Sequence, residues 1–219
     1  MSTPSTAVPA QGPTSPAVRT ALTQAVADLS IGMYQPDEFV APAAASTNAI
    51  KPSIATTTAV WSYSGAALNG SVGAGALSPA RTGTVTTSSS AGAYTLTAIT
   101  WVGLDVNGNA LTDTATLTQT GGNETVSTTK AFASFTSVSG LAMSSTAGAF
   151  VFGFGAVLGL RKLPKVRAGA VAVVAEIANA ARVSNGVTAT PTASPPNGTY
   201  TPNSAPNGTQ SYCLFYELP

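Results

Sequence analysis

The residues that could do chemistry are few, and they are spread along the chain. The sequence contains no histidine, so no imidazole base, no Ser-His or Cys-His pair and no histidine metal ligand can form. Eight acidic residues remain, of which only Asp37 and Glu38 are neighbours. A catalytic acid pair would have to be assembled by folding, for example Asp105 with Asp113. Because Thr-rich segments surround these two acids, we expect both to face solvent, and we predict no catalytic residue and no enzymatic activity.

Asp105, Asn107 and Asn109 have the spacing of the first three ligands of a calcium loop. Two features of that loop are missing, because glycine stands at position 108 instead of after Asn109, and Thr116 replaces the glutamate at position twelve. Alternating apolar residues flank the segment, and Asn-Gly between such runs is the strongest short-range signal for a β-hairpin. We therefore predict a hairpin turn whose two central residues have positive φ, and neither a metal site nor a cofactor.

Two other motifs that could carry chemistry have structural explanations. Gly153, Gly155 and Gly159 loosely match a dinucleotide-binding fingerprint, but neither a helical pattern nor a βαβ unit accompanies them. Small residues at a close approach between two sheets explain these glycines better. The single cysteine, Cys213, lies in an alternating apolar run and has no second cysteine to pair with. We expect it to be a small buried side chain and not a reactive thiol.

One short segment concentrates positive charge. Four of the nine basic residues lie within it, namely Arg161, Lys162, Lys165 and Arg167. No acidic residue occurs between Glu124 and Glu176 to balance them. The segment could face an acidic protein surface or nucleic acid, and it could equally be a solvated loop between strands. We predict that these four side chains make polar contacts with a protein partner, and we favour nucleic acid less.

The overall composition favours assembly. Only 8% of the residues are charged and the formal net charge is +1, whereas about a quarter of the residues are charged in an average soluble protein. Such a surface is coated with hydroxyl groups and small side chains or covered by a partner, and copies repel one another little. The first residues are not typical of a signal peptide, and the most apolar stretch, 149–160, is too short to cross a bilayer. We therefore expect neither export nor a membrane partner.

Residues 1–53 differ from the rest of the sequence and form the first predicted region. Prolines recur throughout this region, and we expect their spacing to prevent sheet formation and to favour an extended arm. Within the arm, the segment from Ser15 to Leu29 is predicted to form a short helix, with Ser15 as N-cap and proline at the first helical position. One face of this helix is apolar, and we predict that it binds a partner through Val18, Leu22, Val26 and Leu29.

Residues 54–219 form the second predicted region, in which short segments rich in Thr and Val alternate with Gly, Asn and Pro. The hairpin around Asn107 and the alternating segment that ends near Val138 predict three consecutive strands in a meander. Short strands separated by short turns continue along the region. The predicted fold class is therefore all-β, an antiparallel β-sandwich or jelly-roll-like domain with an extended N-terminal arm that carries a short helix.

Later segments of this region give three further expectations. Phe150, Phe152 and Phe154 alternate and should share one face of a strand. Residues 190–206 contain five prolines and few apolar residues, which predicts a long surface loop. Residues 211–218 alternate again, and we expect this final strand to close the edge of a sheet.

Two segments of the β region resemble virion proteins of tailed bacteriophages. The first runs from Trp101 to Leu117 and contains a strand followed by a D-x-N-G-N turn, and the second contains the run Thr129-Lys-Ala-Phe132. The resemblance continues in weaker form through a Lys-Leu-Pro step at 162–164 and through residues 205–216. It implies a β-rich component of the particle, such as a head decoration or cement protein.

This resemblance implies a virion protein that is made in the cytoplasm of a bacterial host and joins the capsid. We expect the β domain to bind the major capsid protein on the outer face of the lattice, as a homotrimer, while the arm reaches across neighbouring subunits as a clamp. The alternative is a head or tail fibre, or a module that binds a host surface glycan. Exposed Trp61, Trp101 or clusters of tyrosine in a groove would favour that alternative, whereas buried aromatic side chains would not.

Overall fold

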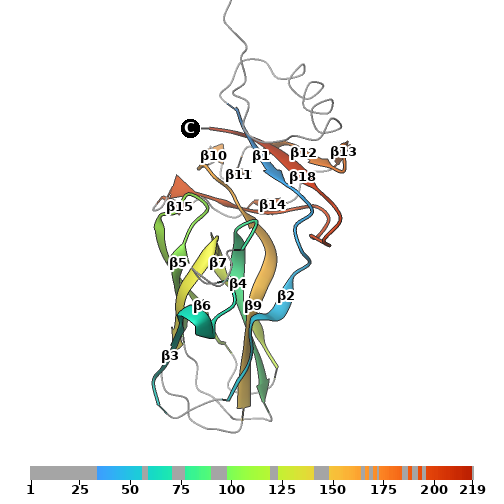
Figure 1. Cartoon of the computed structure of the whole chain (residues 1–219). Helices are drawn as coiled ribbons and strands as arrows, with labels where there is room; N and C mark the ends of the chain where they lie inside the picture. Colours follow the sequence, from blue (N-terminus) through green and yellow to red (C-terminus); the bar gives the residue numbers. More distant parts are fainter. Residues whose placement is uncertain are drawn as a thin grey trace, which may run out of the picture.

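The structure is a computed structural model, and it describes residues 34–55, 59–70, 77–89, 98–118, 123–140, 148–163, 166–167, 170–171, 173–183, 187–188, 192–193 and 196–218. These residues form mostly antiparallel β-strands, which confirms the all-β prediction. Figure 1 shows a long β-sandwich at one end of the molecule and a smaller sheet at the other. One turn of 3-10 helix, η1 (Gly65–Ala67), follows strand β3. No helix in this part of the chain is long and apolar enough to cross a membrane.

Two sheets form the sandwich. The first, which we call the β5 sheet, has the strand order β3-β8-β5-β6. Its strands are β3 (Trp61–Ser64), β8 (Ser134–Gly140), β5 (Ala98–Leu104) and β6 (Ala110–Thr116). The second, the β9 sheet, has the order β14-β17-β9-β4-β7, and β2 also pairs with β9. Its strands are β14 (Val187–Thr188), β17 (Thr199–Thr201), β9 (Gly148–Gly159), β4 (Arg81–Ser89), β7 (Thr125–Phe132) and β2 (Ser46–Ala55).

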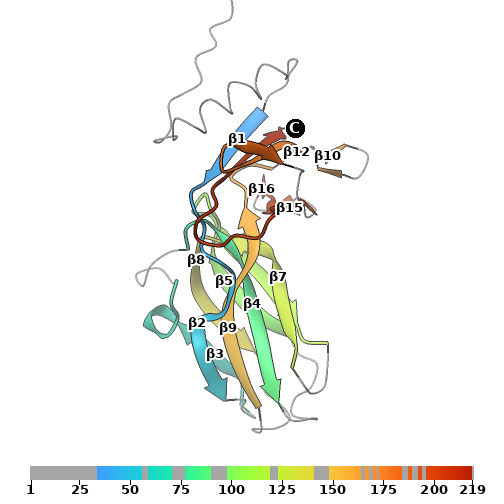
Figure 2. The same cartoon turned by 90° about the vertical axis from the view of Figure 1, so that its right-hand side faces the viewer.

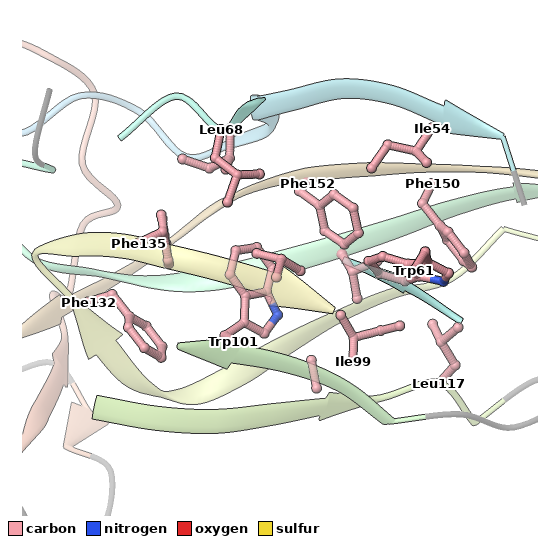
Figure 3. Packing of buried hydrophobic residues seen from close by; sticks show 14 of the residues in the cluster. Ile54, Trp61, Leu68, Ile99, Trp101, Leu117, Phe132, Phe135, Phe150 and Phe152 are labelled. Atoms are coloured by element: carbon pink, nitrogen blue, oxygen red, sulfur yellow. The ribbon is translucent and has the colours of Figure 1, made fainter. Parts of the chain in front are cut away.

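The core between the two sheets is aromatic (Figure 3). Trp101 on β5 is fully buried, and its ring centroid lies 4.9 Å from that of Phe135 and 5.5 Å from that of Phe152, which it meets edge-on. Strand alternation explains the arrangement, because every second residue of a strand points to the same face. Phe150 and Phe152 are buried and Phe154 packs against the same cluster, so the predicted common face is confirmed. Burying each such side chain stabilises the fold by about 1.5–3 kcal/mol.

A third sheet lies at the other end of the molecule (Figure 2). It has its own hydrophobic core. This β18 sheet has the order β1-β18-β12-β13 and consists of β1 (Tyr34–Phe39), β18 (Tyr212–Glu217), β12 (Val173–Ala178) and β13 (Ala181–Val183). Strand β9 reaches both cores, because Leu158 near its end packs in the second cluster with Tyr200, Tyr212 and Tyr216. Two short hairpins also belong to the described chain, β10 (Val166–Arg167) with β11 (Ala170–Val171) and β15 (Thr192–Ala193) with β16 (Pro196–Asn197).

Strands β1 and β2 include residues that the sequence analysis assigned to the arm. β1 pairs with β18 and β2 pairs with β9, so the prediction that the proline spacing prevents a sheet is wrong for both segments. Proline is tolerated because Pro36 lies on an edge strand and Pro52 lies at an irregularity in the β2–β9 register. The predicted helix and its contact residues lie outside the described part of the chain, namely Val18, Leu22, Val26 and Leu29.

Two other strand predictions differ from the structure. β18 is not an edge strand, because it pairs with β1 on one side and with β12 on the other. The segment 190–206 is not entirely a surface loop, because it contributes strand β17 and the fully buried Tyr200. Both features depend on pairing with segments that are distant in the sequence, and local composition does not report such pairing.

The predicted meander is correct for its first two strands only. β5 and β6 pair from Ala98↔Thr116 to Leu104↔Ala110, which confirms the hairpin. The next strand, β7, belongs to the opposite sheet, where it pairs with β4, and β8 then returns beside β5. The chain turns this corner at Ala133, whose N–H donates to the carbonyl of Leu104. Strands that follow one another in the sequence therefore form opposite walls of the core.

The hairpin between β12 and β13 has a two-residue turn at Asn179 and Ala180. Ala178 pairs with Ala181, and the two turn residues have φ values of 47° and 69°, as in a type I′ turn. The backbone N–H of Asn179 donates to the carbonyl of Ser211, and its side-chain oxygen accepts from the Ser211 N–H. Ala180 carries only a methyl group, which is unfavourable at positive φ by about 1–2 kcal/mol.

We expect Ala180→Gly to stabilise the protein by about 1 kcal/mol, because glycine adopts positive φ without the steric cost of a Cβ atom. Urea-induced unfolding should then show a higher midpoint with an unchanged slope. Ala181→Gly, at the adjacent strand position, is the matched control and should lower the stability by about 0.5–1 kcal/mol. Equal effects of the two substitutions would contradict the assigned turn.

Candidate functional site

Asp105 organises the turn between β5 and β6. Its Oδ1 accepts hydrogen bonds from the backbone N–H groups of Asn107 and Asn109, both at 2.8 Å. The Asp105 carbonyl accepts from the N–H of Gly108, and the Asp105 N–H donates to the carbonyl of Asn109. Within this turn only Gly108 has positive φ, so the prediction of two central residues with positive φ is wrong. The carboxylate favours a type I turn followed by a left-handed glycine instead.

Asp113 points from β6 toward the opposite sheet. Its Oδ2 accepts hydrogen bonds from the backbone N–H groups of Thr129 at 2.7 Å and Lys130 at 2.8 Å, and from the Thr129 hydroxyl at 2.9 Å. These groups belong to a stretch of β7 whose register with β4 is irregular. A bulge leaves strand N–H groups without ladder partners, and the carboxylate supplies the missing acceptor. Asp113 therefore joins the edge strands of the two sheets.

Asp37 lies where the β18 sheet meets the end of β9. Its Oδ2 accepts hydrogen bonds from the Arg161 N–H at 2.9 Å and the Tyr216 hydroxyl at 2.8 Å, and the Lys162 N–H donates to that same hydroxyl oxygen at 3.2 Å. No donor among the described residues reaches Oδ1, and the nearest cationic atom, Arg161 Nε, is 3.9 Å away. Burial raises the pKa of Asp37 because the charged form loses hydration, and these hydrogen bonds and the Arg161 charge offset that effect only in part.

Glu124 and Glu176 have the same role at two other places. The Glu124 carboxylate accepts a hydrogen bond from the Thr118 N–H at 3.0 Å, which links the end of β6 to the start of β7. Glu176 on β12 is fully buried and accepts from the Tyr200 hydroxyl at 2.5 Å and from the Asn203 N–H at 3.1 Å. Among the described residues, at least five carboxylates thus accept backbone N–H groups, namely those of Asp37, Asp105, Asp113, Glu124 and Glu176.

The structure describes only part of the predicted basic segment. Arg161 and Lys162 are exposed, and the carbonyl of Arg161 accepts a hydrogen bond from the side-chain amide of Asn107 at 2.8 Å. This bond connects the β5–β6 turn of the sandwich to the corner that holds Asp37. Lys165 and the side chain of Arg167 lie outside the described part of the chain. A partner surface made of all four positive side chains stays a prediction.

Arg81 is a structural cation that the sequence did not reveal. Its side chain is 2% exposed, and its guanidinium donates to the carbonyls of Gly155 at 2.8 Å and Ala43 at 2.9 Å while lying over the ring of Phe154. Burial lowers the pKa of Arg81 to about 10, so it keeps its charge at neutral pH. The side chain ties the segment before β2 to strand β9. A single arginine in a Thr-rich strand has no sequence pattern that distinguishes this role from a solvent-facing one.

The remaining candidates are not brought together into a reactive site. Asp105 and Asp113 do not form a pair, because each carboxylate binds backbone N–H groups of a different segment. The expectation that both acids face solvent is wrong, since Asp105 is buried and Asp113 is half-buried where they accept these hydrogen bonds. In the described ranges no group of three acidic or cysteine side chains could hold a metal ion. Cys213 is buried, which confirms the predicted burial, and burial raises the pKa of its thiol to about 12. Trp61 and Trp101 are 8% and 0% exposed, so neither offers an aromatic surface to a glycan.

The glycines of β9 allow a close approach, as predicted. A Cβ atom on Gly153 would collide with the backbone of Ser46 and Thr47, and one on Gly155 would lie 2.5 Å from the hydroxyl oxygen of Thr82. Ser46 and Thr47 belong to β2, so the strand that approaches comes from the same sheet and not from the opposite one, which corrects the expected contact.

Comparisons with known proteins add no family assignment. No protein-family model matches the chain, and neither curated proteins nor solved structures give a match. A function therefore has to be argued from the residues of the chain itself.

We expect Asp113→Ala to lower the free energy of unfolding by about 1–3 kcal/mol, because it removes a charged acceptor shared by three donors. Urea-induced unfolding measures the loss. Thr114→Ala removes a hydroxyl from the exposed neighbouring position and is the matched control, with an expected change below about 0.5 kcal/mol. An equally small effect of both substitutions would contradict the prediction, because it would mean that water can replace the carboxylate as acceptor of the Thr129 and Lys130 N–H groups.

Asp37→Asn tests the buried carboxylate through pH. The folded-state pKa of Asp37 is raised above its ordinary value of 3.8. Its favourable contribution to stability is therefore fully present below 3.8 and is lost as the pH rises through the raised pKa. We expect the unfolding free energy of the wild type, relative to that of Asp37→Asn, to fall from acidic to neutral pH in a series of urea titrations. A difference that stays constant with pH would contradict the assigned burial effect.

Proposed function

We propose that the chain is a structural component of a virus particle, a decoration or cement protein that binds the outer face of an assembled capsid and stabilises it. One observation carries the proposal. Asp37, Asp105, Asp113 and Glu176 are used inside the fold to complete turns, bulges and corners. The outer strand positions of the β5 sheet carry hydroxyl and uncharged aliphatic groups. A neutral surface of this kind associates without the desolvation cost of charged groups.

The resemblance of residues 101–117 and 129–132 to phage virion proteins supports a capsid as the partner. A protein that binds only the assembled lattice stabilises it by mass action, because each bound copy has to leave before the shell can come apart. Many weak contacts suffice when copies are held side by side on the shell. This kind of activity needs shape and hydrogen bonding and makes no use of a reactive side chain.

The way in which residues 1–33 join the fold suits a clamp. They lead directly into β1, which pairs with β18 over six residues from Tyr34↔Glu217 to Phe39↔Tyr212. Asp37 adds hydrogen bonds from this strand to Arg161 and Tyr216. An arm bound to a neighbouring capsid subunit would pass its load through this ladder into β18, which is itself paired with β12.

The test is binding to empty capsids of the phage that encodes the chain, with the full-length protein and with a variant that lacks residues 1–33. This deletion stops before β1, whereas removal of residues 1–53 would take away β1 and core residue Ile50. We expect the full chain to bind at high copy and to raise the temperature at which the capsids break. The deletion variant should unfold at an unchanged temperature but bind at least about tenfold more weakly, because it loses the second contact.

Two outcomes would contradict the proposal separately. A full-length protein that does not bind capsids would contradict the decoration role itself. A deletion variant that binds as tightly as the full chain would leave the decoration role standing and contradict the clamp.

A further inference from the structure

Hydroxyl groups form rows across the outer face of the β5 sheet. The strand registers place four of them side by side, one on each strand, namely Ser62, Ser139, Thr100 and Thr114. All four point outward, because their neighbours along the strands, such as Trp61, Val138 and Trp101, are buried in the core. Ser64 and Thr112 belong to the next row, and both are exposed.

This face carries no charge in the strands that the structure describes. Every outward position of β3, β8, β5 and β6 is Ser, Thr or an uncharged aliphatic residue. The one charged residue in the described strands of this sheet, Asp113 on β6, points toward the other sheet and binds the backbone of β7. Lys51 on β2 and Lys130 on β7 belong to the other sheet, and the Lys130 ammonium reaches only the edge of β6, where it donates to the carbonyl of Thr112. Soluble β-proteins normally place charges, lysine above all, where strands could meet another molecule. A whole sheet face without them is suited to being covered.

We infer that the outer face of the β5 sheet packs against the same face of a second copy of this chain. A two-fold axis brings each patch against itself, so a charged patch would meet its own charge. A hydroxyl group can both donate and accept, and rows of hydroxyls are therefore complementary to their own copy. Short side chains also lose little rotamer entropy on contact and let two sheets come within about 10 Å.

The size of the face sets the strength of the pairing. Ordinary strand spacings give it an area of about 450 Å², roughly half of the 800 Å² that each partner contributes to a standard interface. The pairing in solution should therefore be weak and dependent on concentration, and it would be strengthened where copies are held close together on a lattice. The inference rests on the proposed structural role, but it is tested without capsids, so its failure is distinct from a failure of capsid binding.

The first test is sedimentation of the full chain over a wide range of concentrations, with Thr100→Arg in the centre of the face and Ser127→Arg on an exposed position of β7 as the matched control. The wild type and Ser127→Arg should form dimers with equal affinity. Thr100→Arg should weaken dimerisation at least about tenfold, because the two-fold axis brings like charges together in the interface. Thr100→Ser keeps the hydroxyl and should keep the dimer.

Three results would overturn the inference. They are a wild type that is monomeric at every concentration, a Thr100→Arg variant that dimerises as well as the wild type, and a mass corresponding to a trimer. The last would agree with the homotrimer expected from the sequence, since a three-fold ring uses two different surfaces of each copy.

Cross-linking gives a second readout that does not depend on an introduced charge. Because the thiol of Cys213 is buried, a cysteine placed on the surface is the reactive one. Thr114→Cys should give a covalent dimer with a short bis-maleimide, and Ser127→Cys should give little. Equal cross-linking of the two variants would overturn the inference. Thermal unfolding is the control that each variant is folded. If Thr100→Arg does not fold, the cross-linking of Thr114→Cys tests the inference in its place.

Discussion

The fold depends on the antiparallel pairing of strand β9 along both of its edges. One edge pairs with β4 from Gly148 to Leu158, and the other pairs first with β2 and then with β17. These ladders hold a single twelve-residue strand in two hydrophobic cores, one aromatic and one rich in tyrosine. Because β2 passes so close to β9, no side chain fits at Gly153. The positions of β2, β4 and β17 are therefore fixed by their hydrogen bonds and close contacts with β9.

The use of charge follows from the irregularities of this β-structure. Strands that bulge or switch sheets leave backbone N–H groups without a partner, and a buried unpaired group costs about 1–3 kcal/mol. Asp113 and Glu176 meet that need with carboxylates, and Arg81 does the same for the carbonyls of Gly155 and Ala43. A chain with 8% charged residues that uses them this way has few left for its surface. The outer face of the β5 sheet is neutral because the few charged residues are used elsewhere in the fold.

Features that depend on neighbouring residues were predictable from the sequence. The hairpin around Asn107, the common face of Phe150 and Phe152, and the buried Cys213 all follow from alternation and turn chemistry over a few residues. The turn itself was assigned the wrong geometry, because the side chain of Asp105 selects a longer loop than Asn-Gly alone would favour.

Features that depend on distant pairing were not predictable. Pro36 indicated an extended arm, since nothing local shows that β1 lies beside β18 and needs no N–H on its open edge. The same holds for the crossing of β7 to the opposite sheet and for the roles of Asp113 and Arg81, each of which binds a segment far away in the sequence. Two of the predicted contact residues, Arg161 and Lys162, lie at the corner where the β18 sheet meets the end of β9. Their backbone N–H groups donate to Asp37 and to the Tyr216 hydroxyl, and Asp37 belongs to the region that the sequence analysis assigned to the arm.

The pairing of β1 with β18 also imposes an order on synthesis. The sandwich strands from β2 to β9 can pair as they leave the ribosome, but β1 has to wait until residue 217 has emerged. At ordinary rates of translation that delay is about ten to forty seconds. During this time the segment before β2 has no partner strand in β18, so its anchor is complete only when β18 has been made. An unfinished chain would therefore lack a fixed attachment for its first residues, and premature engagement of a lattice would be disfavoured.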